Sequence, residues 1–410
     1  MEFEETNSEE NYVRENYEQI CSWQISLFAV VCVLFSIVRI IKFVPTMPTS
    51  VYYIGWGILA TYILLHKKKR INFSMVLFLI FCLLSIIANV IDPKYSVWLR
   101  FFGFLMIVGS IGPLFDGDWL YKARQTCFFS INLTLMTTTI ISFILYCIYP
   151  QLMLTERGHL YGGITVHSMQ LGPISGLSAI YICYMILCSN DMNIIKRMLF
   201  YVCFVISLLS CLLAGSRSAL GATFLSLLLL VWLYYQKDIK KIIGIGVVSI
   251  GLVIASIPIW WEYTETVQKK IEYSQGKGDL LVSRKGIWEI RLREFLENPV
   301  FGCGFATTIY GISSADGIVE PGNGWLFVLS STGLIAFIFF VFIYLRLIAN
   351  LYKIKTPESF LLIASLVFYG IHLNAEGYTL SSGIFTFFLL WASLGYAFSY
   401  VNHNKSICSI

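Results

Sequence analysis

Charged residues are scarce in this sequence. Asp, Glu, Lys and Arg make up 13% of its 410 residues, whereas hydrophobic residues make up 57%. Soluble domains contain about 25% charged residues, so this composition excludes two or three ordinary soluble domains. It predicts an all-α polytopic integral membrane protein. The net charge of +5 includes no basic tail and no alternation of aromatic and basic residues, so we expect no nucleic-acid partner.

Signatures of soluble enzymes are also absent. The sequence contains no Walker loop, no GxGxxG after a predicted strand, no HExxH and no GxSxG. FGCGF, residues 301–305, is interpreted as a tight turn. The eleven cysteines form no CxxC pair and no cluster with histidine, so we expect no disulfide and no cofactor. No acidic pair lies in a predicted outer loop, so we expect no metal site, although Asp279 and Asp316 stay open as ligands. With no nucleotide site, the energy for a reaction has to come from the substrate.

Apolar windows are abundant instead. Windows of about 20 apolar residues, the length that crosses a bilayer, recur twelve times. They lie near 23–43, 50–66, 71–91, 97–115, 127–149, 168–188, 198–214, 217–235, 242–261, 324–345, 358–374 and 379–400.

Positive charges in the short loops predict the orientation of these windows. His66-Lys67-Lys68-Lys69-Arg70 follows the second window and indicates the cytoplasmic side. Both termini are then cytoplasmic, with sixteen basic residues inside and six outside the membrane, apart from one long outer loop. The predicted regions are a cytoplasmic tail (1–22), a nine-span bundle (23–261), a large extracytoplasmic loop (262–322), a three-span bundle (323–400) and a second cytoplasmic tail (401–410).

The large loop contains one periodic segment, SRKGIWEIRLREFLENP. Arg284, Trp288, Arg291 and Phe295 recur at i, i+4, i+7 and i+11, which predicts an amphipathic helix ending before Pro299. We expect this helix to lie on the membrane surface with its guanidinium groups at headgroup height.

Arg217 is the most informative charge, because it separates two almost uninterrupted apolar stretches. An uncompensated charge there is expensive. One interpretation is an anchor at a helix end, but Arg217 falls on the predicted outer side, where a lone anchoring arginine is disfavoured. Its small neighbours Ser216 and Ser218 leave room for a ligand. A guanidinium binds phosphate oxygens in pairs, so Arg217, Arg284 and Arg291 together predict a diphosphate pocket.

Three stretches together resemble the bacterial O-antigen polymerase and O-antigen ligase superfamily. They are AGSRSALGA, RKGIWEIRLREFLENPVFGCGF and GNGWLFVLSSTGLIAF, and the resemblance covers about 214–345. It implies a GT-C-like glycosyltransferase whose substrate is an oligosaccharide on undecaprenyl diphosphate. Transfer would occur outside the cytoplasmic membrane, with inversion and without nucleotide or metal.

The resemblance also implies roles for particular residues. Arg217 is similar to the family's diphosphate-binding arginine, and Arg284 to the loop arginine that precedes the tryptophan. The turn NPxxGxG is matched by Asn298, Pro299, Gly302 and Gly304.

One position departs from the ligase pattern. Ligases that attach glycan to lipid A core have a His-Asn pair before the following span, with a leucine and then a glycine at spacings kept here by Asn323, Leu326 and Gly333. Gly322 stands where the histidine is expected. That histidine is the presumed base in ligases, so its loss favours a polymerase.

The remaining candidates concern the base and the substrate contacts. Glu376 is the first candidate base, because apolar Leu373 and Tyr378 beside it would raise its pKa; an exposed loop glutamate is the alternative. His167 is second, with a structural histidine as the alternative, and Glu320 is third, with a solvated glutamate as the alternative. The expected substrate-binding residues are Arg291, Arg157, Asn323 and Trp288.

The sequence thus predicts an inner-membrane polymerase for O-antigen, capsule or another exopolysaccharide, with its active site facing the periplasm or the cell exterior. Its expected partners are the lipid-linked oligosaccharide and membrane lipids, and a chain-length regulator stays open. The alternatives are an O-antigen ligase, a flippase for lipid-linked oligosaccharide, a solute transporter or channel, and a scaffold. A flippase would be expected to show related halves and charges deep in several spans, and the sequence shows neither.

Overall fold

The computed structural model describes residues 23–24, 26–45, 49–66, 69–155, 160–188, 193–238, 240–241, 244, 282–314 and 317–408. Within these ranges the chain is almost entirely helical, as an all-α membrane protein requires. The strands of this part of the chain are β1 (Arg70–Ile71) and β2 (Phe115–Asp116), which pair antiparallel with Arg70 opposite Asp116.

Helices occupy eleven of the twelve predicted windows, and most of the ninth, 242–261, lies outside the described residues. They are a helix over Ser26–Val38, α2 (Thr49–Leu65), α3 (Phe73–Ile87), α4 (Val97–Ser110), α5 (Asp118–Ile148), α7 (Ser168–Cys188), α8 (Ile194–Leu213), α9 (Arg217–Tyr235), α13 (Gly324–Ile354), α14 (Pro357–His372) and α15 (Phe385–Cys408). The connections contain the 3-10 helix η1 (Pro93–Tyr95), α6 (Pro150–Met153) and α12 (Val282–Glu297).

Not all of these helices are long enough to cross a bilayer alone. Among the described residues, five are long and apolar enough, namely α5, α7, α8, α9 and α13. Four shorter apolar helices accompany them, over Ser26–Val38, Tyr53–Leu65, Phe73–Ile87 and Pro357–His372. The membrane class is therefore supported, and the number of twelve spans stays a prediction.

Small and hydroxylated residues line the helix contacts, whereas large apolar side chains face outward. On α8, Leu199, Val202 and Val205 are more than half exposed, as expected for a lipid-facing surface. Toward α7, the Ser207 hydroxyl lies 3.0 Å from the hydroxyl of Ser178. Close helix approach through small residues is the usual packing in membranes, where apolar burial alone gives little driving force between helices.

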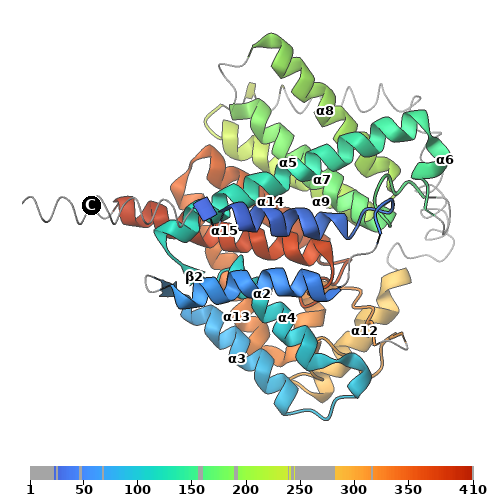
Figure 1. The fold of residues 1–410 in the computed structure, drawn as a ribbon, viewed down its shortest axis with the longest axis vertical. Helices are drawn as coiled ribbons and strands as arrows, with labels where there is room; N and C mark the ends of the chain where they lie inside the picture. The colour runs from blue at the N-terminus through green and yellow to red at the C-terminus, as the bar shows by residue number, and fades with distance from the viewer. Residues whose placement is uncertain are drawn as a thin grey trace, which may run out of the picture.

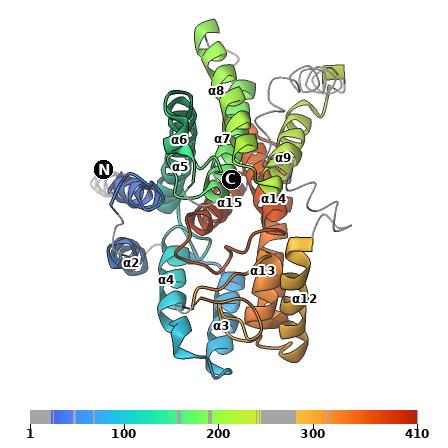
Figure 2. The same cartoon turned by 90° about the vertical axis from the view of Figure 1, so that its right-hand side faces the viewer.

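The bundle has two distinct ends (Figures 1 and 2). The strand pair and the last turns of α15 lie on the left of Figure 1, here called the β2 end, and α6 and α12 lie on the right, here called the α12 end. At the α12 end, α13 starts next to the end of α14, because the Gly324 N–H donates to the Leu373 carbonyl at 2.7 Å. At the β2 end, the Thr356 hydroxyl just before α14 lies 2.7 Å from the Tyr400 hydroxyl of α15.

Candidate functional site

Two predicted site residues meet at the α12 end. Arg284, near the start of α12, donates from Nη2 to Glu376 Oε1 at 2.8 Å. Its Nη1 lies 3.8 Å from Glu320 Oε1. The Arg284 and Glu376 side chains are 21% and 23% exposed, so the pair is half-buried yet open to a ligand. Glu376 and Glu320, the first and third candidate bases, therefore both lie next to Arg284.

The pKa of Glu376 is raised above the usual range of a glutamate. Burial is the main cause, and the charge of Glu320 adds to it. Arg284 acts in the opposite direction and holds the pKa lower than burial alone would. A raised pKa makes the ionised carboxylate a stronger base, which suits the role predicted from the sequence.

Asn323 positions the loop that contains Glu376. Its Oδ1 caps α13 by accepting from the N–H groups of Trp325 at 2.9 Å and Leu326 at 3.0 Å. Its Nδ2 donates to the carbonyl of Asn374 at 3.0 Å. Asn323 is buried and its amide groups are used in these bonds. The structure therefore supports a positioning role for Asn323, and its predicted contact with substrate stays a prediction.

The structure gives a physical reason for the glycine at position 322. Gly322 has φ +66°, and a Cβ there would lie 2.5 Å from Ile287 Cγ2 of α12. Its carbonyl accepts from Trp288 Nε1 at 3.3 Å. A histidine at this position would be strained by the positive φ and would require Ile287 of α12 to shift. The half-buried Trp288 is held against the loop, and its predicted contact with substrate stays a prediction.

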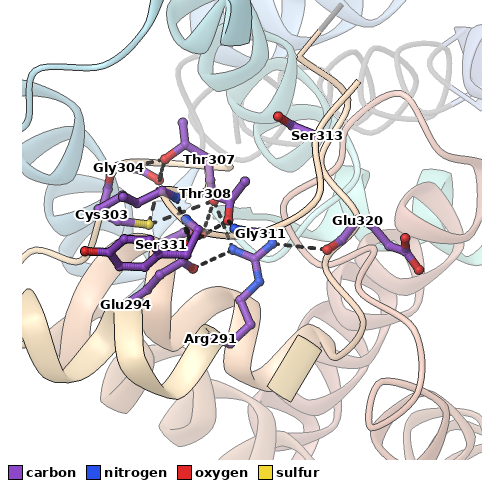
Figure 3. Close-up of polar contacts among 12 residues, drawn as sticks. Arg291, Glu294, Cys303, Gly304, Thr307, Thr308, Gly311, Ser313, Glu320 and Ser331 are labelled. Atoms are coloured by element: carbon purple, nitrogen blue, oxygen red, sulfur yellow. Dashed lines mark hydrogen bonds and ion pairs between the residues drawn. The ribbon is translucent and has the colours of Figure 1, made fainter. Parts of the chain in front are cut away.

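The expectation that the Arg291 guanidinium is exposed to lipid headgroups is wrong. Its side chain is 0% exposed, and Nη1 donates to Glu294 Oε2 at 2.9 Å and to the Thr307 carbonyl at 3.1 Å (Figure 3). The guanidinium also lies over the Phe327 ring of α13, 4.9 Å from its centroid. Helix α12 packs against α13, which covers the face that contains Arg291. The spacing of the residues correctly predicts that Arg291 shares a helical face with Arg284 and Trp288, but it does not predict that α13 covers this face.

The buried Arg291–Glu294 pair organises the segment that follows α12. Glu294 Oε1 accepts from the Thr308 hydroxyl, from the Ile309 N–H at 2.7 Å and from the Tyr310 N–H at 3.1 Å. Arg291 Nη2 donates to the backbone carbonyl of Glu320 at 3.3 Å, while the Glu320 carboxylate points away from Arg291 (Figure 3). The pair therefore fixes the backbone that presents Glu320 to Arg284.

The NPxxGxG turn docks on a break in α13. Gly333 has φ +82° and interrupts the helical hydrogen bonding. The freed carbonyls of Ser330 and Ser331 accept from the N–H groups of Cys303 at 2.8 Å and Gly304 at 3.2 Å. In return the Leu334 N–H donates to the Pro299 carbonyl at 2.9 Å. The tight turn expected for FGCGF is present, and its glycines allow backbone to lie against backbone.

Arg217 and His167 lie at the starts of two adjacent helices. Arg217 is the first residue of α9 and is half-buried, and Ser216 caps that helix. A Cβ at Gly172 of α7 would lie 3.0 Å from Ser216 Cβ, so the first turns of α7 and α9 are side by side. His167 directly precedes α7 and is exposed. Figure 1 shows α9 starting on the side of the α12 end. Arg157 lies outside the described residues.

A comparison with known families finds a match over part of the chain. Residues 202–341 match the family model described as O-Antigen ligase. The chain contains a domain of the O-antigen ligase and polymerase superfamily. Members of this superfamily are glycosyltransferase-like enzymes, either polymerases or ligases. No curated protein matches the chain.

The O-antigen ligase domain contains part of the site and not all of it. Arg217, Arg284 and Glu320 lie within the matched residues, whereas His167 precedes them and Glu376 follows them. The ion pair between Arg284 and Glu376 thus joins the domain to the loop after α14.

Sequence reasoning missed His372, which lies in the last turn of α14, four residues before Glu376. The His372 carbonyl accepts from the Glu376 N–H at 3.1 Å. The buried ring stacks on Phe368, and its Nδ1 lies 3.1 Å from the Tyr378 hydroxyl. Nε2 has no hydrogen-bond partner within the described part of the chain. The spacing of His372 and Glu376 at a predicted helix end was the available signal.

Metal and thiol chemistry receive little support from this site. No group of three or more His, Cys, Asp or Glu residues that could hold a metal occurs among the described residues, and independence from metal stays a prediction. Cys303 in the docked turn is a free thiol whose pKa burial raises to about 12, so it is a poor nucleophile at neutral pH.

Proposed function

We propose that this protein is a polysaccharide polymerase that joins undecaprenyl-diphosphate-linked oligosaccharide repeat units on the outer face of the cytoplasmic membrane. The main supporting observation is the Arg284–Glu376 ion pair of 2.8 Å beside Glu320. It places an anion-binding guanidinium next to a carboxylate with a raised pKa, at one end of an apolar bundle.

The reaction is an inverting displacement at the anomeric carbon of the reducing-end sugar. A hydroxyl of the incoming repeat unit forms the new glycosidic bond, the bond to the diphosphate breaks, and undecaprenyl diphosphate leaves. Glu376 takes the proton of the attacking hydroxyl. Arg284 and Arg217 bind the departing diphosphate, whose charge grows in the transition state, so they stabilise that state more than the bound substrate.

In the resting site, Arg284 neutralises Glu376. A donor diphosphate offers this guanidinium a stronger, bidentate partner. Movement of Arg284 toward the donor frees Glu376 and raises its pKa further, so donor binding prepares the base. Nucleotide and metal have no part in this scheme.

An O-antigen ligase is the second candidate, because the family match includes ligases. Gly322 weighs against it, since it replaces the histidine of the ligase pattern, and a side chain there would be strained by the positive φ and would require Ile287 to shift. A flippase has no need of a base next to an anion site.

The finer parts of the proposal follow from the charge pattern. We propose twelve spans, cytoplasmic termini and a site that faces the periplasm or the cell exterior. The product is O-antigen, capsule or another exopolysaccharide, and a chain-length regulator is a further partner to test.

Deleting the gene and separating the surface polysaccharide on a gel tests the class. Loss of a polymerase collapses the ladder to single repeat units that are still transferred. Loss of a ligase leaves lipid-linked polymer stranded at the membrane. Loss of a flippase leaves single lipid-linked units on the cytoplasmic face.

A further inference from the structure

A polar cavity of about 300 Å³ lies at the β2 end, between the strand pair, the start of α5 and the end of α15. Its charged and polar lining includes Lys69, Arg70, Asp116, Asp118, Asn402 and His403. The site around Arg284 is at the other end of α14, which has 16 residues and is therefore about 24 Å long. The cavity is thus separate from the proposed active site.

Asp116 contributes a buried carboxylate to this cavity. It is 5% exposed and accepts a hydrogen bond from Asn402 Nδ2 at 2.9 Å. Among the described residues, no Lys, Arg or His nitrogen lies within 4.0 Å of its carboxylate, although Arg70 is its cross-strand neighbour. The buried Arg124 guanidinium acts on Asp116 electrostatically without forming an ion pair with it. A buried carboxylate with no cation in contact is costly, so this side of the cavity suits an ammonium group.

The same cavity also contains positive charge. Arg70 is exposed at the rim. The Lys69 ammonium donates to the Leu64 carbonyl and lies over the Phe115 ring, 5.6 Å from its centroid, which leaves it further N–H donors. An anion fits beside these two groups. A ligand with one anionic group and one ammonium group satisfies both sides of the cavity, whereas a simple anion would meet Asp116 unfavourably.

Apolar side chains surround the basic rim. Leu65, Ile71 and Phe73 are 78%, 58% and 71% exposed, and they flank Lys69 and Arg70 in the chain. Exposed apolar groups next to a polar cavity suit an amphipathic ligand, with its headgroup inside and its acyl chains along the protein surface. Trp119 and Tyr121 in the lining are residue types enriched at the headgroup level of membranes.

We propose that this cavity binds the phosphoethanolamine headgroup of a membrane phospholipid. The phosphate lies toward Lys69 and Arg70, and the ammonium lies toward Asp116. The ligand joins the strand pair to α15 and to the start of α5, at the end of the bundle opposite the Arg284 site. This proposal does not depend on the polymerase activity.

Native mass spectrometry of the full-length protein in detergent tests this proposal. The ligands are ethanolamine, glycerol and choline phospholipids with identical acyl chains, and free phosphoethanolamine. We expect the ethanolamine lipid to bind at least about tenfold more tightly than the other two lipids, because only it offers N–H donors to Asp116. Equal binding of all three lipids would contradict the proposal. Free phosphoethanolamine that binds as tightly as the lipid would overturn the lipid assignment.

Substitutions in the cavity test whether the lipid binds there. Asp116→Asn should abolish the preference for ethanolamine lipid, whereas Asp238→Asn, which breaks an ion pair outside the cavity, should keep it. The exposed Arg70→Gln should weaken all three lipids alike without affecting folding, because they share the phosphate, and it tests the site even if Asp116→Asn misfolds. An unchanged preference in a folded Asp116→Asn protein, or unchanged affinities in Arg70→Gln, would refute the assignment.

Discussion

Arg284 lies between two carboxylates, so an incoming anion competes with them for its guanidinium. Its Nη2 is 2.8 Å from Glu376, whereas Nη1 is 3.8 Å from Glu320. The Glu376 contact is the stronger one at rest. A guanidinium can donate to two oxygens side by side, and an ammonium cannot. The shape and the charge of Arg284 therefore both contribute when an incoming anion replaces Glu376 as its partner.

Arg284→Lys keeps the charge and removes the fork. We expect kcat/KM to fall by about 10²- to 10³-fold, the usual loss when one transition-state contact is removed. The measurement is polymer formation from a purified lipid-linked repeat unit. Arg293→Lys is the matched control, because Arg293 lies on the same helix and pairs at the surface with Glu297. Equal losses in both variants would assign the effect to α12 as a whole.

Glu376 should set the rising limb of the pH–rate profile. Its pKa is raised mainly by burial, and the charge of Glu320 contributes in the same direction. Glu320→Gln removes that charge, so the pKa of Glu376 falls and the limb moves to lower pH. Glu297→Gln, a surface change on α12, should leave the limb in place.

Glu376→Gln removes the base and should lower kcat by roughly 10²- to 10⁴-fold. The limb assigned to Glu376 should disappear from the residual activity. A variant that keeps the wild-type limb would show that another group, such as His372 or His167, accepts the proton.

At the scale of elements, the Arg291–Glu294 pair holds α12 to the segment that presents Glu320. Breaking a buried pair leaves an uncompensated charge and costs about 3–5 kcal/mol. We therefore expect Glu294→Gln to lower the melting temperature in detergent strongly. Glu297→Gln breaks an exposed pair on the same helix, which water screens, and should change the melting temperature little. Similar melting temperatures for the two variants would contradict the structural role of Arg291.

The break in α13 gives a second element-scale prediction. Gly333 has φ +82°, and a Cβ there would overlap the Val300 carbonyl oxygen. Gly333→Ala should cost about 1–3 kcal/mol from backbone strain alone, displace the NPxxGxG turn and reduce activity. Gly221→Ala is the control, because nothing lies within 4 Å of a Cβ there. A melting temperature equal to that of the control would rule out docking of the turn on this break.

The predictive power of the sequence differs between these features. Apolar windows located the helices, because length and hydrophobicity are local properties. Chemistry alone predicts Arg284 and Glu376 as site residues, but no local pattern reveals contact between residues 92 positions apart. Arg291 was misjudged because periodicity gives a shared helical face and not its covering. Its partner Glu294 lay outside the predicted stripe and was therefore missed.

At the scale of the whole molecule, the two ends of the bundle contain different proposed sites. The α12 end contains the Arg284–Glu376 pair, and the β2 end contains the polar cavity lined by Lys69, Arg70 and Asp116. The proposed orientation assigns the first end to the cell exterior and the second to the cytoplasm.

Labelling with a membrane-impermeant maleimide checks this orientation. Lys94 is exposed and lies near Gly317 of the segment after α12, whereas Lys405 follows the cavity residues of α15. Lys94→Cys should react in intact spheroplasts, and Lys405→Cys only after permeabilisation. Most described native cysteines are buried or half-buried, and the wild-type protein gives the background, including exposed Cys147. The reverse pattern would place the proposed site in the cytoplasm and exclude an extracytoplasmic polymerase.

Product analysis with the purified protein tests the central claim most directly, namely that guanidinium groups at the α12 end bind a departing diphosphate. The protein is incubated with a lipid-linked repeat unit in EDTA, and both polymer and free undecaprenyl diphosphate are measured. The account predicts one released undecaprenyl diphosphate for each new linkage, with both products reduced together in Arg217→Lys and Arg284→Lys. Wild-type polymer yields in these two variants, or synthesis abolished by EDTA and restored by Mg²⁺, would contradict it.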